Sequence, residues 1–257
     1  MVADLVLGAV AYDAKVVPIW EGFRAYFRAR DLAFDFVLYS NYERQVAAHL
    51  RGDIDVAWNS PLAWLHACRA APDRARAIAM RDTDRDLTSV VLVRADDPIA
   101  LGDLRRVGCG AADSPQATLI PLRALADAGA TVEPVLHDVL VGKHGDHVGG
   151  EREAVKALLA REVDAACVID GNRLAFVREG LIATSGPRAV RVLLQTAPYD
   201  HCNFTVLDHT PAIAHFLDLL LAMSYDDPEV RPLLDLEGLT RWLPGRTSGY
   251  ALLERAL

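Results

Sequence analysis

The chain has 257 residues, of which 52% are hydrophobic and 24% are charged, and its formal net charge is −8. This size and composition suit a globular protein of one large or two smaller domains and exclude a disordered chain. The balance of 27 Lys and Arg against 35 Asp and Glu argues against nucleic acid as a partner, and no apolar run approaches the roughly 20 residues that membrane insertion needs.

The N-terminus leads directly into a first predicted strand at Leu5–Val10, without the basic start and small-residue cleavage site of a secretory signal. The sequence as written therefore predicts a cytoplasmic protein, or a periplasmic or extracytoplasmic one if a leader was removed. The cysteines form no CxxC pair, and in a chain of this length they predict reduced thiols. They are Cys68, Cys109, Cys167 and Cys202.

The first part of the chain alternates between predicted strands and predicted helices. A helix over residues 17–30 has Trp20, Phe23 and Phe27 on one face. Ser40 or Asn41 is the expected N-cap of a second helix, and the pair Ser60-Pro61 is typical of the start of a third. Besides Leu5–Val10, strands are predicted at residues 33–39, 54–58, 77–80 and 89–94.

The same alternation continues after a polar, proline-containing break at residues 95–98. Strands are predicted at 107–110, 132–136, 165–169 and 190–195, and helices at 115–128 and 153–161. A second break at residues 196–200 leads to a strand at 203–207 and to helices at 212–225 and 250–256. Strands that alternate with helices indicate an α/β fold with mixed sheets flanked by helices.

Residues 50–58 and 159–167 are copies of one pattern: a helix end, a tight turn, an acidic residue and a buried strand. Together with the two breaks, this repeat predicts a two-lobed protein with two crossovers. Residues 1–95 and 201–257 form the first lobe, and residues 96–200 form the second. A ligand is then expected in the inter-lobe cleft, at the carboxyl ends of the strands. Hinge closure is expected at residues 96–98 and 197–200.

Three serines lie at predicted junctions between a strand and a helix: Ser40, Ser60 and Ser114. The first turn of a helix has unpaired N–H groups and a partial positive charge, so a hydroxyl there can help to hold an oxyanion. N-capping alone is the other interpretation of each serine.

Residues 41–43 (NYE) and 52–61 (GDIDVAWNSP) resemble the first-lobe signature of the phosphonate/phosphite-type solute-binding proteins of ABC transporters. The similarity extends from about residue 8 to residue 207. It implies the type II periplasmic-binding fold and a protein that closes on a small anionic ligand: a phosphonate, a phosphate ester or a related oxyanion. It also implies an ABC transporter permease as partner, and no cofactor.

The resemblance also assigns ligand contacts. Tyr42 matches a tyrosine that lines the family's site, and Ser114 matches the first serine of the second-lobe anion loop, where Gln116 departs from the family's sequence. Glu151 stands where many members have a histidine, and Cys202 or its neighbour stands where amino-phosphonate binders have an acidic residue. With the strand ends added, the predicted ligand-binding residues are Tyr12, Tyr42, Asn59, Ser60, Ser114, Gln116, Glu151, Asp170, Cys202 and Asn203.

Some of these residues have other interpretations. Asp170 ends a strand, where its carboxylate can accept from a ligand ammonium or cap the next helix. The loop His144-Gly145-Asp146-His147 is a solvated loop, a ligand contact or a metal site.

An enzyme on the same scaffold is the alternative function: a cytoplasmic protein that uses His144, His147 and Cys202, with or without a metal. His201 adjoins Cys202, but neighbouring residues of a strand point to opposite faces, so the sequence predicts that His201 is badly placed to activate this thiol. No GxGxxG, P-loop lysine or GxSxG occurs, so nucleotide and hydrolase chemistry have no motif support.

Overall fold

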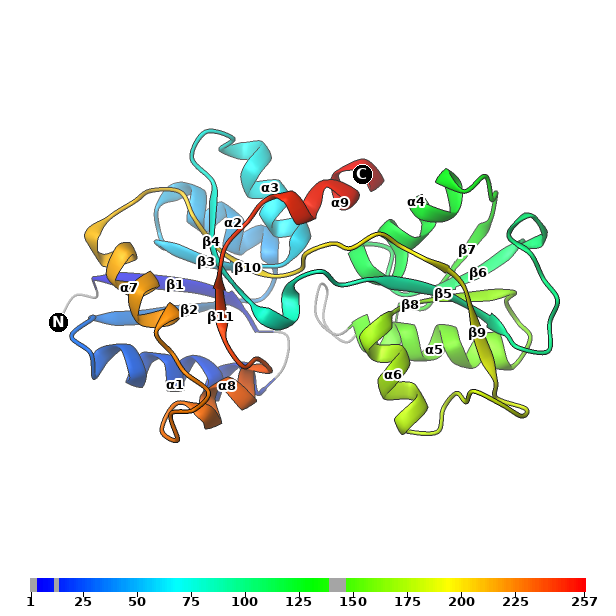
Figure 1. The fold of residues 1–257 in the computed structure, drawn as a ribbon. Coiled ribbons are helices and arrows are strands. Elements are labelled where there is room, and N and C mark those ends of the chain that lie inside the picture. The colour runs from blue at the N-terminus through cyan, green and yellow to red at the C-terminus, as the bar shows by residue number, and fades with distance from the viewer. Residues whose placement is uncertain (1–3, 12–13, 139–146) are drawn as a thin grey trace. The chain divides into compact units, whose positions relative to one another are not determined.

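The computed structural model describes residues 4–11, 14–138 and 147–257, without the side chains of residues 147–149. The chain divides into two compact units (Figure 1). Unit 1 consists of Met1–Arg85 and Asp200–Tyr250, and unit 2 of Asp86–Tyr199 and Ala251–Leu257. Within these described ranges, no helix combines the length and the apolar character that crossing a bilayer demands.

Unit 1 is built on a sheet of six strands: β1 (Leu5–Val10), β2 (Phe34–Tyr39), β3 (Val56–Asn59), β4 (Arg76–Arg81), β10 (Asn203–Val206) and β11 (Trp242–Pro244). Their order is β11-β4-β10-β3-β1-β2. β1 pairs in parallel with β2 and β3, whereas β10 runs antiparallel to both β3 and β4. The carboxyl ends of β1 to β4 and the amino end of β10 therefore meet at one border of the sheet, which we call the strand-end edge of unit 1.

Helices cover both faces of this sheet (Figure 1). The helices of unit 1 are α1 (Val16–Arg28), α2 (Tyr42–Arg51), α3 (Pro61–Ala70), α7 (Pro211–Leu221) and α8 (Arg231–Glu237), with short 3₁₀ turns η1 (Asp82–Asp84) and η4 (Ser248–Tyr250). α1 buries the predicted face of Trp20, Phe23 and Phe27. The Phe27 ring lies 4.8 Å from Phe34 of β2 and 5.0 Å from Phe216 of α7, so these helices share one aromatic core against the sheet.

Unit 2 is built on a sheet of five strands: β5 (Ser89–Arg94), β6 (Arg106–Cys109), β7 (Glu133–Leu136), β8 (Ala165–Ile169) and β9 (Val190–Gln195). Their order is β7-β6-β8-β5-β9, and only β5 runs antiparallel to its neighbours. The helical segments of unit 2 are η2 (Leu101–Asp103), the π-helical turn η3 (Pro115–Leu119), α4 (Ile120–Asp127), α5 (His147–Leu159), α6 (Asp170–Arg178) and α9 (Ala251–Ala256). The carboxyl ends of β6, β8 and β9 and the amino end of β5 form the strand-end edge of unit 2.

The units differ from the predicted lobes in two places. The sequence predicts that residues 89–94 belong to the first lobe, but β5 pairs with β8 and β9 in the sheet of unit 2. The first passage between the units therefore lies after residue 85 and not at residues 96–98. The C-terminal helix α9 contacts α4 and η3 of unit 2, so the last residues leave the first unit again.

The predicted repeat is present in the structure. Gly52 and Arg161 follow α2 and α5 and both have positive φ, +79° and +63°. The carboxylates of Asp55 and Asp164 then accept hydrogen bonds from the backbone of the neighbouring parallel strand, at 2.7 Å from β1 and at 2.8 Å from β6. Each unit therefore uses the same turn to direct a central strand into its sheet.

α5 begins earlier than the sequence predicts. The glycines at 149 and 150 indicate a loop, but the helix already starts at His147. A Cβ on Gly150 would lie 2.5 Å from the carbonyl oxygen of His137 and 3.2 Å from Gly110, so this glycine is required by close backbone packing. A glycine that serves packing inside a helix has the same sequence signal as a glycine in a loop.

Acid is expected to weaken unit 1 through His49 of α2. Burial lowers the pKa of this imidazole to about 4, whereas it titrates near about 6.5 in the unfolded chain. Stability that depends on the neutral ring is present above pH 6.5 and is lost as the pH falls towards 4. We expect His49→Leu to reduce the loss of unfolding free energy between pH 7.5 and 4.5 by about 2 kcal/mol.

Tryptophan fluorescence in urea measures this difference for unit 1 alone, because all four tryptophans belong to it: Trp20, Trp58, Trp64 and Trp242. The matched control is His66→Leu on the exposed side of α3, which should leave the acid dependence as in the parent chain. An equal acid dependence in the parent chain and in His49→Leu would contradict the prediction.

Candidate functional site

Two helices of unit 1 start at its strand-end edge. Asn41, and not Ser40, is the N-cap of α2, where its Oδ1 accepts a hydrogen bond from Arg44 N at 2.9 Å. Ser60 caps α3 by accepting from Ala63 N at 3.3 Å. Both side chains thus satisfy one N–H group of the first helical turn, while the other N–H groups of that turn have no partner inside the helix. Tyr42 is the first residue of α2 and is largely buried.

The predicted residue Asn59 is the last residue of β3 and is fully buried. Its Nδ2 donates to Thr205 Oγ1 at 2.9 Å, and its Oδ1 accepts from Gln45 Nε2 at 2.8 Å. Both ends of this amide are therefore occupied by groups of unit 1.

Asn203 continues the same chain of hydrogen bonds. Its Oδ1 accepts from Thr205 Oγ1 at 2.7 Å, and its Nδ2 donates to the Tyr250 hydroxyl at 2.8 Å. Tyr250 in turn donates to the carbonyl oxygen of His201 at 2.8 Å. The structure thus brings Asn59 and Asn203 together in a buried network that fixes the amino end of β10.

The sequence interpretation missed three members of this network: Gln45, Thr205 and Tyr250. Gln45 is the residue for which a signal existed, because it lies beside Val46 on the buried side of α2. A polar residue at a buried helical position needs a hydrogen-bond partner, and that requirement points to a network.

A group of charged and ionisable side chains lies next to this network, and we call it the Arg81 cluster: Arg81, Asp84, His201, Cys202 and Glu237. Arg81 makes two contacts with Asp84, Nε to Oδ2 at 2.5 Å and Nη2 to Oδ1 at 3.0 Å, and its Nη1 donates to Glu237 Oε1 at 3.2 Å. Burial opposes ionisation of Asp84, but the charges and hydrogen bonds of Arg81 and His201 together outweigh it and lower the pKa of Asp84 to about 2. Burial raises the pKa of Glu237 to about 7.

The prediction about His201 and Cys202 is wrong. The two side chains are adjacent, with His201 Nδ1 3.1 Å from Cys202 Sγ, because β10 begins only at Asn203 and the strand alternation does not apply to these two residues. The same nitrogen lies 3.3 Å from Asp84 Oδ1. Burial lowers the pKa of His201, but the opposing charges and hydrogen bonds of Cys202 and Asp84 prevail and raise it to about 10.

In unit 2, η3 begins at the strand-end edge. Ser114 is buried and caps this turn by accepting from Ala117 N at 3.2 Å. Ser89 Oγ donates to the carbonyl oxygen of Gln116 at 2.5 Å and lies 2.6 Å from the Tyr199 hydroxyl, which must therefore donate to it. Gln116 Oε1 is buried and has no hydrogen-bond partner within the described part of the chain.

Glu151 and Asp170 surround the start of α6. Glu151 is fully buried in α5, and its Oε2 accepts from Ile169 N at 3.0 Å and from Asn172 Nδ2 at 2.9 Å. Asp170 Oδ1 accepts from Arg173 Nε at 2.5 Å. The N-cap of α6 is Ile169, so Asp170 does not take the predicted capping position.

Three predicted residues cannot be placed. Tyr12 and His144 lie outside the described residues, and so does the side chain of His147. The predicted use of the two histidines with Cys202 therefore stays a prediction.

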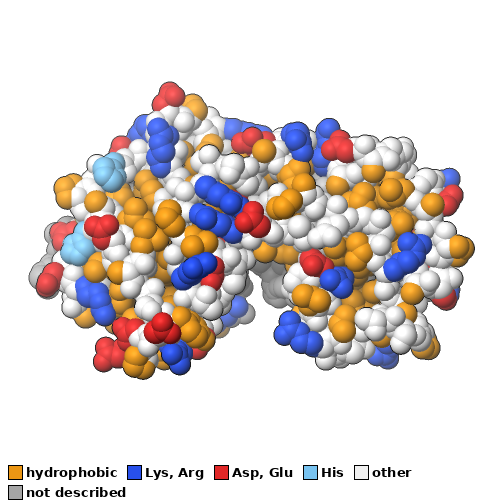
Figure 2. Space-filling view, viewed as in Figure 1, with side chains coloured by type: hydrophobic (Ala, Val, Ile, Leu, Met, Phe, Trp, Pro, Cys, Tyr) orange, Lys and Arg blue, Asp and Glu red, His pale blue; other side chains and the backbone are white. Residues whose placement is uncertain are grey.

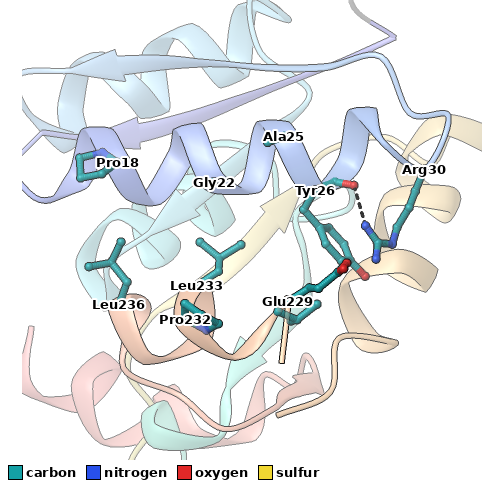
Figure 3. Close-up of a pocket in the computed structure, with 10 residues that line it drawn as sticks. Pro18, Gly22, Ala25, Tyr26, Arg30, Glu229, Pro232, Leu233 and Leu236 are labelled. Carbon is teal, nitrogen blue, oxygen red and sulfur yellow. Dashed lines mark hydrogen bonds between the residues drawn. The ribbon is translucent and has the colours of Figure 1, made fainter. Parts of the chain in front are cut away.

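A cavity of about 390 Å³ lies between α1 and α8 of unit 1 (Figure 3). Gly22 and Leu233 form part of its wall, and at one end the Arg30 guanidinium lies 3.8 Å from the centre of the Tyr26 ring. Its lining contains none of the predicted ligand-binding residues. On the face drawn in Figure 2, the described basic and acidic side chains are interspersed, without the continuous basic surface that nucleic acid requires.

Comparisons with known proteins agree with this architecture. A family model described as "ABC transporter, phosphonate, periplasmic substrate-binding protein" matches residues 10–250. No curated protein sequence matches the chain.

Solved structures share the fold at low sequence identity. PhnD1 from Prochlorococcus marinus, in complex with methylphosphonate, has a TM-score of 0.69 and 17% identity over 98% of this chain and 96% of its own. A protein from Xanthomonas citri bound to ATP has a TM-score of 0.69 and 17% identity over 98% of this chain and 95% of its own. The periplasmic aliphatic sulphonate binding protein SsuA from Escherichia coli has a TM-score of 0.55 and 17% identity over 98% and 85%.

Proposed function

This chain belongs to the family of periplasmic substrate-binding proteins of phosphonate ABC transporters, and from this premise we propose that it binds a phosphonate, a phosphate ester or a related oxyanion and delivers it to a membrane permease. The observation that carries the proposal is the family match over residues 10–250. The named ligands of the similar structures support the ligand class, since methylphosphonate, ATP and aliphatic sulphonates all carry tetrahedral phosphorus or sulphur oxyanions. A periplasmic location is part of the same proposal.

The strand-end edges supply the groups that such a ligand needs. Because Ser60 and Ser114 are the N-caps of α3 and η3, each unit places the first turn of a helix at the end of a strand. Unpaired N–H groups and the partial positive charge of the first turn favour an anion. We assign ligand contact to Tyr42, Ser60 and Gln116.

Asn59, Asn203 and Glu151 then act by holding these groups in place. Asn59 and Asn203 fix β3 against β10, and Glu151 fixes the start of α6 through two hydrogen bonds. A chain that holds its site with buried hydrogen bonds loses little conformational entropy when the ligand arrives.

Gln116 gives the sharpest test in unit 2. Its side chain is nearly buried, and its Nε2 is a hydrogen-bond donor from which a ligand oxyanion can accept. We expect Gln116→Leu to weaken methylphosphonate binding by about tenfold to 100-fold, the loss typical of a hydrogen bond to a charged group. Isothermal titration calorimetry measures this affinity directly.

Gln195→Leu is the matched control, since Gln195 is an exposed glutamine of unit 2 whose Nε2 donates to Thr88 Oγ1 at 3.1 Å. It should bind methylphosphonate as the parent chain does. A parent chain that binds none of methylphosphonate, an alkyl sulphonate and a phosphate monoester would overturn the proposed function. Binding that is equal in the parent chain and in Gln116→Leu would overturn only the assignment of Gln116.

A further inference from the structure

Three different ligand atoms of the Arg81 cluster surround one point in unit 1. His201 Nδ1 lies 3.1 Å from Cys202 Sγ and 3.3 Å from Asp84 Oδ1, and all three atoms lie within 4.8 Å of one another. A backbone hydrogen bond of 2.8 Å, from His201 N to the carbonyl oxygen of Asp84, fixes the two segments against each other. The arrangement therefore depends on the pairing of β4 with β10 and not on flexible side chains alone.

We propose that Cys202, His201 and Asp84 form a zinc-binding site. A thiolate, an imidazole nitrogen and a carboxylate oxygen are the ligand types that Zn²⁺ prefers in proteins. In a tetrahedral site with ordinary zinc–ligand bond lengths, neighbouring ligand atoms are about 3.5 Å apart. The two separations that involve His201 Nδ1, 3.1 Å and 3.3 Å, need only a small widening to reach that value. Three protein ligands leave a fourth position, which water takes.

A proton occupies the position that the metal would take. His201 Nδ1 lies close to both Asp84 Oδ1 and Cys202 Sγ, and a nitrogen between two such acceptors must carry a hydrogen. Zinc replaces that hydrogen, because ligand nitrogen and sulphur must be deprotonated.

The charges of the cluster suit a divalent cation. When ionised, Asp84, Glu237 and Cys202 carry three negative charges, and Arg81 contributes one permanent positive charge. The net charge of these four side chains is then −2, which a zinc ion neutralises when His201 is neutral.

Arg81 is the positioning residue of this site. Its contacts with both oxygens of Asp84 fix the carboxylate so that Oδ1 faces His201. Partners of this kind orient metal ligands and influence affinity without touching the metal. His201 itself contacts Asp84 and Cys202 through its ring and the Tyr250 hydroxyl through its carbonyl oxygen, and the next carboxylate along the chain, Asp200, is paired with Arg246.

Cobalt(II) provides the test, because it replaces zinc in tetrahedral sites and a thiolate ligand gives it a charge-transfer band in the near ultraviolet. The protein is treated with EDTA under reducing conditions, dialysed and titrated with Co²⁺ at pH 7.5. We expect the band to saturate at one cobalt per chain and to disappear on addition of Zn²⁺. Cys202→Ser should abolish the band and weaken Zn²⁺ binding at least about tenfold.

Cys68→Ser is the matched control, since Cys68 lies on α3 and outside the cluster. Cys68→Ser should keep the charge-transfer band. His201→Gln retains the thiol of Cys202 but lacks the imidazole ligand, so this variant should bind Zn²⁺ more weakly. Far-ultraviolet circular dichroism and the thermal midpoint without metal establish that each variant is folded. No saturable band in the parent chain, or a band that survives Cys202→Ser, would overturn the proposal. The outcome is independent of phosphonate binding.

Discussion

Replacing Arg81 by glutamine is expected to lower the unfolding free energy of unit 1 by about 3–5 kcal/mol, the cost of leaving a buried charge without its partner. Asp84 is almost completely buried and receives two hydrogen bonds from Arg81. Glutamine supplies one donor group and no charge, so the carboxylate keeps only His201 as a charged partner. The variant also loses the contact of the guanidinium with the ring of Trp58, at 5.2 Å.

Urea unfolding followed by tryptophan fluorescence measures this loss for unit 1. Arg24→Gln is the matched control, because Arg24 pairs with Glu21 and Asp35 at the surface, where ion pairs contribute at most about 1 kcal/mol. If both variants lost the same free energy, the Arg81 cluster would be no more stabilising than an exposed pair.

The pH dependence of the unfolding free energy distinguishes the loss of a charged partner for Asp84 from a simple loss of packing. In the parent chain the pKa of Asp84 is lowered from 3.8 to about 2, so its contribution to stability is present at neutral pH and is lost as the pH falls from about 4 to about 2. In Arg81→Gln, the loss of the guanidinium raises the pKa of the same carboxyl above its value in the parent chain, and protonation relieves the buried charge. We therefore expect the difference in unfolding free energy between the two proteins to narrow as the pH falls from 7 to 4.

Features set by neighbouring residues were predictable from the sequence. The buried face of α1 follows from the spacing of Trp20, Phe23 and Phe27, and the start of α3 follows from Ser60 and Pro61. The repeated turn before β3 and β8 is also local, since a helix end, a tight turn and an acidic residue are read within nine positions. These local patterns were sufficient to predict an α/β fold of two units.

Features that depend on which distant strand or helix a segment packs against were not predictable from the sequence. Ser89–Arg94 is a clear strand in the sequence, but nothing local indicates that it pairs with β8 and β9 of unit 2. Likewise, nothing in the local sequence of α9 indicates that it packs against α4 and η3 of unit 2. The candidate site shows this limit most clearly, because Asp84 and Cys202 meet only through the pairing of β4 with β10.

The start of a strand also decides the direction of side chains. If β10 began at His201, the imidazole ring of His201 and the thiol of Cys202 would lie on opposite faces of the sheet. The strand begins at Asn203, and the backbone of His201 is instead held by Asp84 and Tyr250. The sequence already predicts a strand from residue 203, so the error came from applying strand alternation to the two residues that precede it.

Phe204→Ala is expected to lower the unfolding free energy of unit 1 by about 3–5 kcal/mol, the usual cost of removing a buried phenylalanine ring. Phe204 is fully buried on β10, in the interior of the sheet. Its ring lies 4.7 Å from Trp58, 5.1 Å from Trp242 and 5.4 Å from Phe216. These neighbours come from strands and a helix that cannot all move inward, so the substitution leaves a cavity.

The control for this substitution is Phe36→Ala, since Phe36 lies on the edge strand β2 and is only partly buried. It should cost clearly less in the same urea experiment, because fewer surrounding atoms lose contacts. Equal losses in the two variants would show that β10 is not the central support of unit 1. The expected difference matters for the site as well, because β10 places Asn203 and Cys202 at the strand-end edge. A folded Phe204→Ala chain should therefore also show weaker cobalt binding, whereas Phe36→Ala should not.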